Sequence, residues 1–217
     1  MPQILKVDPN SWENTLSETK KVLKAGGIVA FPTDTLYGLG VSPYNRIAVD
    51  KIYEIKGRDP EKPLLLLIDS VSKLETLVEE PSTACIKLMQ AFWPGPLTLL
   101  FKPKPSSIHE NITANLIGIR QPGNPITQKI LSAFDHPLTA PSANISGGNP
   151  ATTAQQVLDT FGKKVELILD AGECKGGKPS TLINATDSPA RLIRAGSIDF
   201  ESIQECLNGC LQTQESL

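Results

Sequence analysis

Apolar positions along the chain follow two patterns that alternate over most of its length. Short continuous apolar runs, such as residues 28–31 and 64–68, are typical of buried strands. Between such runs, apolar residues recur at helical spacing, as Trp12, Leu16 and Leu23 do ahead of the stop signal Gly26-Gly27. This alternation predicts an α/β fold, a layered arrangement of helices against strands.

The same two patterns predict the individual elements. Strands are predicted at residues 4–7, 28–31, 64–68, 97–101, 117–119, 138–140, 165–169, 181–183 and 192–193. Helices are predicted from Trp12 to Gly26-Gly27 and at residues 47–55, 74–78, 84–92, 126–134, 154–161 and 198–207, the last with Ser197 as N-cap. We expect a single domain over residues 1–217, with a core at about 12–207, a tail at 208–217 and a mobile loop at 102–115.

Composition narrows the class of protein. The chain has 217 residues, of which 40% are hydrophobic, enough for one sizeable core. Its net charge of -2 provides no general basic field for nucleic acid, and no apolar run approaches the roughly 20 residues that span a bilayer. The four cysteines, Cys85, Cys174, Cys206 and Cys210, lack the spacing of a zinc site. We therefore expect no metal site, no membrane contact and a cytoplasmic location with reduced thiols.

Five cations stand in or beside loops at the edges of apolar elements. They are Lys56, Arg58, Lys62, Arg120 and Arg194. Each taken alone fits a solvated surface charge, but together they favour a shared anion site, because arginine and lysine both bind phosphate. In layered α/β folds ligands sit where strands end, so these residues could line one cleft of nucleotide size.

Three polar loops have both a structural and a functional interpretation. In residues 32–40, Asp34 could form an Asx turn or the loop could bind a small polar ligand. Ser142 and Asn144 could cap a turn or bond phosphate oxygens. The segment 175–178 fails the Walker pattern, which favours a plain turn, and both histidines are expected at the surface.

The chain closely resembles the YrdC-like family, the threonylcarbamoyl-AMP synthases, from about Trp12 to about Leu207. The resemblance rests on two signature segments, Lys56-Gly57-Arg58 (followed by Lys62-Pro63-Leu64) and Ser142-Ala143-Asn144. It also rests on the segments 26–39, 93–98, 119–122, 180–183 and 194–196, and all of these pieces follow one another along the chain in the order found in the family. It implies an open, twisted, mixed sheet flanked by helices, with a concave, positively charged cleft that holds ATP.

The resemblance also implies a reaction and a set of partners. Threonine, bicarbonate or carbon dioxide, and ATP with Mg²⁺ would give threonylcarbamoyl-adenylate and pyrophosphate. A downstream transferase would then pass the threonylcarbamoyl group to adenosine in tRNA. The product forms through an unstable carbamate, so a closed cleft must hold that carbamate against the α-phosphorus.

Residue roles follow from the same resemblance. Lys56 and Arg58 would be catalytic and, with Lys62, would bind the phosphates. Ser142, Asn144 and Arg194 would add contacts to the nucleotide. Arg120 would pair with the threonine carboxylate, and Thr35 and Ser180 would contact the threonine ammonium or hydroxyl.

Two positions depart from the family pattern, and three alternative functions remain. Leu67 stands where longer archaeal members have a histidine, and Leu116 stands where many members have a threonine. The alternatives are a module for RNA binding or ribosome maturation, with weak direct contact to tRNA, a relative that handles carbamoyl-adenylate, and a YciO-type paralogue. The Lys56/Arg58 and Ser142/Asn144 signatures and the set Thr35, Arg120 and Ser180 favour the synthase.

Overall fold

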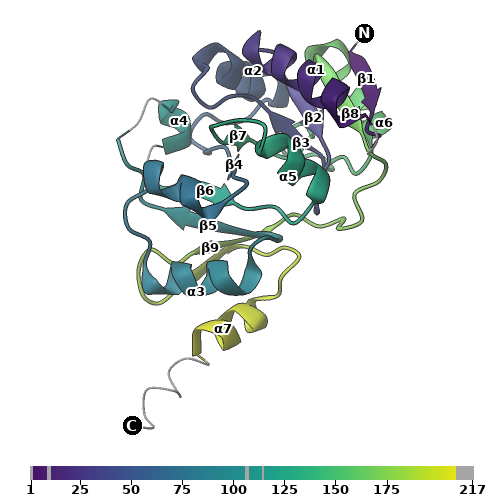
Figure 1. The fold of residues 1–217 in the computed structure, drawn as a ribbon. Helices are drawn as coiled ribbons and strands as arrows, with labels where there is room; N and C mark the ends of the chain where they lie inside the picture. Colours follow the sequence, from purple (N-terminus) through teal and green to yellow (C-terminus); the bar gives the residue numbers. More distant parts are fainter. Residues whose placement is uncertain (1, 9–10, 106–107, 114, 209–217) are drawn as a thin grey trace, which may run out of the picture.

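The computed structural model describes residues 2–8, 11–105, 108–113 and 115–208, and it confirms the predicted alternation of strands and helices (Figure 1). The strands are β1 (Gln3–Lys6), β2 (Val29–Phe31), β3 (Gly38–Gly40), β4 (Leu66–Leu67), β5 (Leu97–Phe101), β6 (Ile117–Arg120), β7 (Leu138–Thr139), β8 (Leu167–Asp170), β9 (Thr181–Asn184) and β10 (Arg191–Arg194). The helices are α1 (Trp12–Lys24), α2 (Arg46–Lys56), η1 (Val71–Thr76), α3 (Thr83–Phe92), α4 (Glu110–Thr113), α5 (Pro125–Leu131), α6 (Ala154–Phe161), η2 (Gly162–Lys164) and α7 (Phe200–Asn208).

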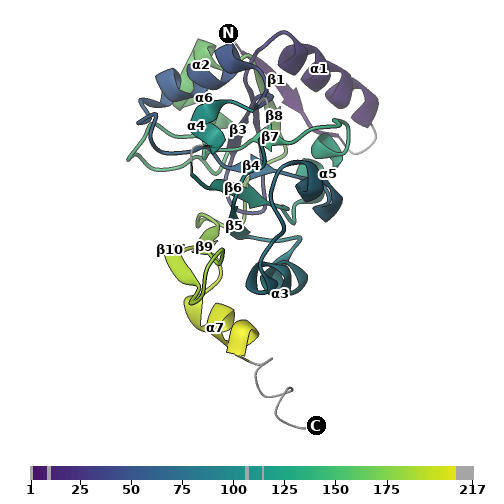
Figure 2. The same cartoon turned by 90° about the vertical axis from the view of Figure 1, so that its left-hand side faces the viewer.

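The strands divide between two mixed sheets. One has the order β1-β8-β2-β3 and the other β10-β9-β5-β6-β4-β7. In the larger sheet, β5 runs parallel to β9 and antiparallel to β6, while β4 runs parallel to β6. Figure 2 shows β10 and β9 at the α7 end of this larger sheet. Both sheets contribute residues to the lining of the candidate site, among them Gly38 of β3 and Leu67 of β4.

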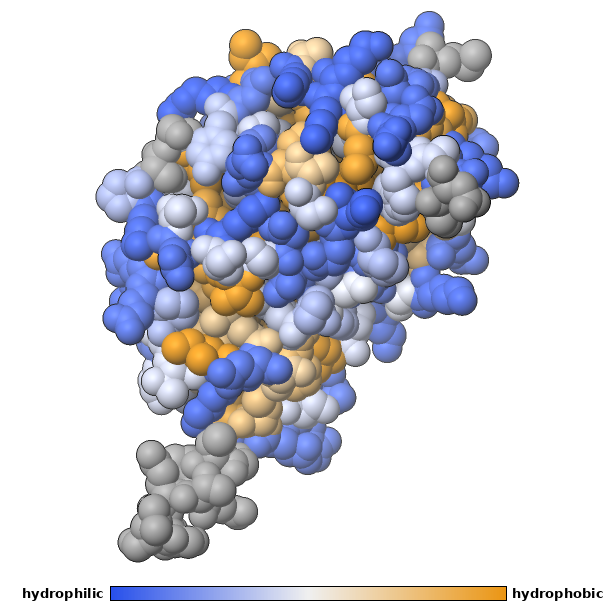
Figure 3. Space-filling view, in the orientation of Figure 1, coloured by the Kyte–Doolittle hydropathy of each residue, from blue (hydrophilic) through white to orange (hydrophobic). Residues whose placement is uncertain are grey.

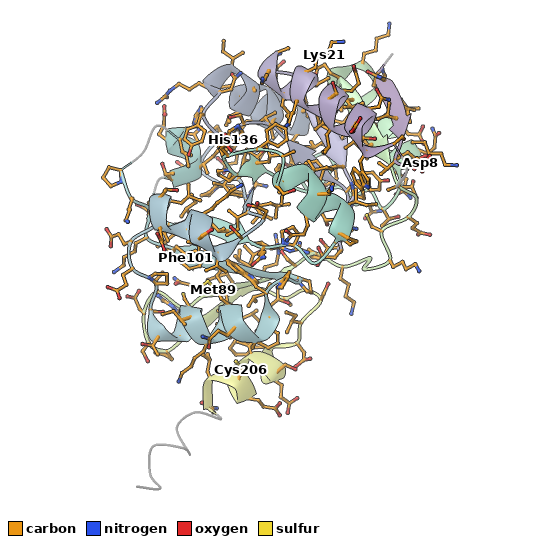
Figure 4. The ribbon with its side chains drawn as sticks, in the orientation of Figure 1. Asp8, Lys21, Met89, Phe101, His136 and Cys206 are labelled. Atoms are coloured by element: carbon orange, nitrogen blue, oxygen red, sulfur yellow. The ribbon has the colours of Figure 1, made fainter. Side chains whose placement is uncertain are left out.

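Two apolar clusters join the helices to the sheets. The larger cluster includes Ile52 of α2, Met89 of α3 and Phe101 of β5, and Cys206 of α7 packs against it. Figure 4 labels Met89, Phe101 and Cys206 in this part of the fold. Hydrophilic side chains cover most of the face in Figure 3, and apolar ones show between them in separate patches. Within the described ranges, no helix is long and apolar enough to cross a bilayer.

The structure corrects several local predictions. Ser197 does not cap α7, which begins at Phe200; the carboxylate of Asp199 instead accepts a hydrogen bond from Ser202 N at 2.7 Å. The strand β3 was not predicted, because its sequence Gly-Leu-Gly has no alternating pattern. The expected loop at 102–115 contains α4, and the expected tail, apart from Asn208, lies outside the described residues.

The two histidines differ from the surface role expected for both. His109 is only 4% exposed, and its Nε2 lies 3.0 Å from Asp50 Oδ1. The apolar neighbours Ile108 and Ile112 are buried as well, which explains why this histidine turns inward. His136 is half-buried and lies between the rings of Tyr44 and Phe134.

Candidate functional site

A cavity of about 860 Å³ draws its lining from segments far apart in the chain. Its walls include the loop after β2, the loop after α2, the segment after β7 and the last two residues of β10. Alternate residues of three neighbouring strands line it: Thr98 and Leu100 of β5, Gly118 and Arg120 of β6, and Ser180 and Leu182 at β9. Alternation arises because every second side chain of a strand faces the same side of a sheet.

Seven of the nine predicted site residues line this cavity. They are Thr35, Arg58, Lys62, Arg120, Ser142, Ser180 and Arg194. Four of them are cations, and Glu61 is the one carboxylate in the described lining. Lys56 and Asn144 are not lining residues; both are buried beside the cavity.

The end of α2 explains why Arg58 faces the cavity and Lys56 does not. Gly57 adopts the left-handed conformation (φ 55°) that ends the helix, and this turns the chain sharply between the two cations. Arg58 then donates from Nε to Lys62 O and from Nη2 to Pro63 O, both at 2.9 Å. Partial burial lowers the pKa of its guanidinium. These two bonds hold the guanidinium at the cavity wall.

The ammonium of Lys56 is buried against the loop that contains Ser142. Its Nζ donates to Ser142 O at 2.5 Å and to Asn144 O at 2.6 Å, and the side chain is 2% exposed. Burial, with repulsion from Arg58 as a smaller cause, lowers the Lys56 pKa to about 8. Lys56 therefore fixes the path of this loop by binding two of its carbonyl groups.

Side chains of the same loop bond to one another. Ser142 Oγ donates to Asn144 Oδ1 at 2.6 Å, and Asn144 Nδ2 donates to the carbonyls of Ile145 and Gly148. Asn144 thus closes a turn, as its structural interpretation predicted, while Ser142 also lines the cavity. The two signature segments around Lys56 and Ser142 form one connected unit.

Arg120 is buried at the cavity and already has three partners. Its Nε donates to Gly95 O and its Nη1 to Thr35 Oγ1, both at 2.9 Å, and its Nη2 pairs with the Asp34 carboxylate. Burial lowers the pKa of the guanidinium, and the charge of Asp34 opposes that shift. Since a guanidinium carries five N–H donors, two can still serve a bound carboxylate.

Of the two interpretations of the loop around Asp34, the Asx turn is wrong. Asp34 pairs with Arg120 and does not form the Asx turn. The turn is closed by Thr33, whose hydroxyl accepts from the N–H groups of Thr35 and Leu36. Gly176 packs directly on this segment, where a Cβ would overlap the carbonyl oxygen of Asp34. The segment 175–178 therefore has a packing role against the cavity wall.

A second network joins Ser180, Thr98 and Arg194. Ser180 Oγ lies 2.7 Å from Thr98 Oγ1, and Arg194 Nη2 donates to Ser180 Oγ at 3.0 Å and to Ser180 O at 2.9 Å. Partial burial and then repulsion from Arg120 and Arg58 lower the pKa of Arg194. Gly196 lets the chain approach this closely, because a Cβ there would overlap the backbone of residues 179–181.

The described lining of the cavity offers cations and hydroxyl groups, and it contains no cluster of metal ligands. Among the described residues, no group of three His, Cys, Asp or Glu side chains could hold a metal ion. A Mg²⁺ carried by nucleotide phosphates fits such a lining, because the phosphates and water supply its ligands.

A family model described as telomere recombination, and named for Sua5, YciO and YrdC, matches residues 21–196. The chain belongs to this family. All nine predicted site residues lie within the matched segment, as do Asp34 and Thr98. The cavity is therefore built from the part of the chain that the family shares.

Two relatives of the chain are named for the same activity. The chain is 40% identical over 187 residues to the threonylcarbamoyl-AMP synthase of Pyrococcus abyssi, across 85% of this chain and 55% of that protein. It is 36% identical over 204 residues to a putative threonylcarbamoyl-AMP synthase of Methanocaldococcus jannaschii, across 94% of this chain and 96% of that protein. The chain thus spans about half the length of the Pyrococcus abyssi relative and nearly all of the other.

A solved structure of the family has the same fold. The crystal structure of P. abyssi Sua5 complexed with L-threonine matches with a TM-score of 0.88 and 34% sequence identity. The match covers 95% of this chain and 61% of that one. These comparisons confirm the predicted family and the mixed, helix-flanked sheets.

Proposed function

We propose that this chain is a threonylcarbamoyl-AMP synthase. Threonine, bicarbonate and ATP give threonylcarbamoyl-adenylate, pyrophosphate and water. The threonine amine adds to the carbon of carbon dioxide formed from bicarbonate. A carbamate oxygen then attacks the α-phosphorus, and the bond to the leaving pyrophosphate breaks. Mg²⁺ enters with ATP and offsets charge on the phosphates.

The observation that carries this proposal is the set of cations in one cavity. Arg58, Lys62, Arg120 and Arg194 come from segments up to 136 positions apart and share a space of about 860 Å³ with one lining carboxylate. A concave, positively charged cleft of this size suits a nucleoside triphosphate with a small amino acid. The cavity uses both sheets, which supports a single domain over the chain.

Arg58, Lys62 and Ser142 are assigned to the phosphates. The Arg58 guanidinium is held by two carbonyl groups, so it stands in place before charge builds on the equatorial oxygens. Lys56 and Asn144 are assigned to holding the loop that presents Ser142. Arg194 is assigned to the nucleotide side of the cavity.

Arg120 and Thr35 are assigned to the amino acid. Arg120 has two N–H donors beyond its three protein bonds, which matches the two oxygens of a carboxylate. Its existing bonds fix the plane of the guanidinium. The bound threonine would then place its amine at a set distance from the α-phosphorus, which is the positioning that an unstable carbamate requires.

The product implies a downstream partner. A mixed anhydride of a carbamate and a phosphate is reactive in water, so we propose that a transferase takes the threonylcarbamoyl group to tRNA. The experiment that tests the activity measures pyrophosphate release from Mg-ATP and bicarbonate, with and without threonine, and then with serine or glycine. We expect release that depends on threonine. Release independent of any amino acid would favour a relative that handles carbamoyl-adenylate.

A further inference from the structure

The cavity contains a buried hydroxyl to which neither the sequence motifs nor the comparisons give a role. Thr98 of β5 is 3% exposed, lines the cavity and lies 2.7 Å from the hydroxyl oxygen of Ser180. On its other side, the pairing of Leu99 with Ile119 brings Thr98 next to Arg120 of β6. Thr98 therefore lies between two residues assigned to the amino acid.

The bonds of Ser180 determine what this pair of hydroxyls can still offer. A guanidinium only donates, so Ser180 Oγ accepts from Arg194. One of the two hydroxyl protons is used between Ser180 and Thr98, whichever residue donates it. The other proton remains, and in either case the Thr98 oxygen keeps at least one unused lone pair. The pair can therefore both donate a hydrogen bond and accept one.

The charges around the pair favour a neutral ligand group over a cation. Arg194 contacts Ser180 directly, and its pKa is lowered partly by repulsion from Arg120 and Arg58, so positive charge is concentrated here. A substrate ammonium placed at Ser180 would be repelled by the same guanidinium groups. A substrate hydroxyl is neutral and also both donates and accepts, so it complements the pair.

We propose that Thr98 and Ser180 together bind the side-chain hydroxyl of the amino-acid substrate, which makes Thr98 a specificity-determining residue. This rests on the proposed function and decides between the two contacts, ammonium or hydroxyl, left open for Ser180. A site that hydrogen-bonds a substrate hydroxyl rejects the analogue that lacks it, because its own polar groups are then left unpaired.

The test compares L-threonine with L-valine, which has nearly the same shape but no hydroxyl. Calorimetric Kd values for both amino acids are measured in the presence of a non-hydrolysable ATP analogue, together with kcat/KM from pyrophosphate release. The variants are Thr98→Val, which removes the hydroxyl, and Thr98→Ser, which keeps it. Thr19→Val is the matched control, since Thr19 is also a buried, hydrogen-bonded threonine and lies outside the cavity.

We expect the preference for threonine over valine to fall about 10-fold in Thr98→Val, the loss typical of one hydrogen bond. Thr98→Ser and Thr19→Val should keep the wild-type ratio within about 3-fold. A fall in affinity for both amino acids alike, at constant ratio, overturns the inference. A binding preference for threonine that falls in Thr98→Val, in a protein that releases no pyrophosphate, would contradict the proposed function while supporting the role of Thr98.

Discussion

The guanidinium of Arg120 and the carboxylate of Asp34, 86 positions apart in the chain, form an ion pair beside the cavity. Arg120 is 2% exposed, so its charge is removed from water and needs this partner. The pair also holds the orientation of the guanidinium, whose two remaining N–H donors the proposed function assigns to a substrate carboxylate. On the proposed function, Asp34 is therefore a positioning residue for the amino-acid side of the site.

Replacement of Asp34 by asparagine keeps the shape of the side chain and removes its charge. Because Arg120 then carries an uncompensated buried charge, we expect a loss of stability of about 3 kcal/mol and a KM for threonine raised about 10-fold. The KM for ATP should change much less. Urea unfolding and steady-state kinetics measure both effects.

Asp159→Asn is the control for this prediction. Asp159 lies on the exposed side of α6, where it accepts a hydrogen bond from Gln155. The Asp159→Asn variant should keep the stability of the wild type and its KM values for threonine and for ATP. Equal kinetic effects of Asp34→Asn on threonine and ATP would show that Asp34 does not act through the amino-acid side.

Replacement of Arg58 should affect the use of ATP, whereas replacement of Asp34 should affect the binding of threonine. Arg58→Ala removes a guanidinium that two carbonyl groups hold at the cavity wall. We expect kcat/KM for ATP to fall at least about 100-fold, since the lost charge acts on the developing transition state. Arg46→Ala, which removes a cation outside this cavity, should retain wild-type activity. Full turnover by Arg58→Ala would remove Arg58 from the phosphate site.

The lowered pKa of Lys56 predicts a pH dependence of stability. With a folded pKa of about 8 against an unfolded value of 10.5, the unfolded chain binds more protons between these values. The free energy of unfolding of the wild type, minus that of Lys56→Met, should therefore rise with pH across this window, by up to roughly 3 kcal/mol. Urea unfolding of both proteins at several pH values measures this difference. A flat difference would mean that Lys56 titrates like an exposed lysine.

Gly118 offers a way to fill the cavity without disturbing the fold. A Cβ on Gly118 would lie 3.6 Å from Leu100 Cδ2 and 3.7 Å from Thr98 Cγ2, which are ordinary contacts. Gly118→Ala should therefore keep the melting temperature within about 2 °C of the wild type while weakening substrate binding several-fold. Thermal unfolding and calorimetry test the two halves separately. A large drop in melting temperature with unchanged affinity would contradict the placement of Gly118 at the cavity.

Much of the fold could be predicted because strand and helix patterns are local. The largely apolar segment 97–101 and the helical spacing from Trp12 to Leu23 each carry their own signal, and both elements appear as predicted. The division into two sheets could not be predicted, because strand pairing depends on contacts between distant segments. The strand β3 was missed since glycine contributes no alternating pattern.

The candidate site was predictable as a set of residue types, but not as a set of contacts. Spacing alone could not tell that Lys56 turns inward while Arg58 faces the cavity; that depends on the left-handed turn at Gly57. Asp34 and Thr98 were missed because their partners, Arg120 and Ser180, lie 86 and 82 positions away. No local motif carries that information.

The most direct test of the account follows the carbon of bicarbonate. Radiolabelled bicarbonate is incubated with the protein, Mg-ATP and threonine, and the nucleotides are separated at once. We predict label in an adenylate that appears together with pyrophosphate, disappears when threonine is omitted, and is lost in Arg58→Ala. Pyrophosphate release without labelled adenylate, or labelled adenylate formed without threonine, would contradict the claim that this cavity joins an amino acid to a nucleotide through a carbamate.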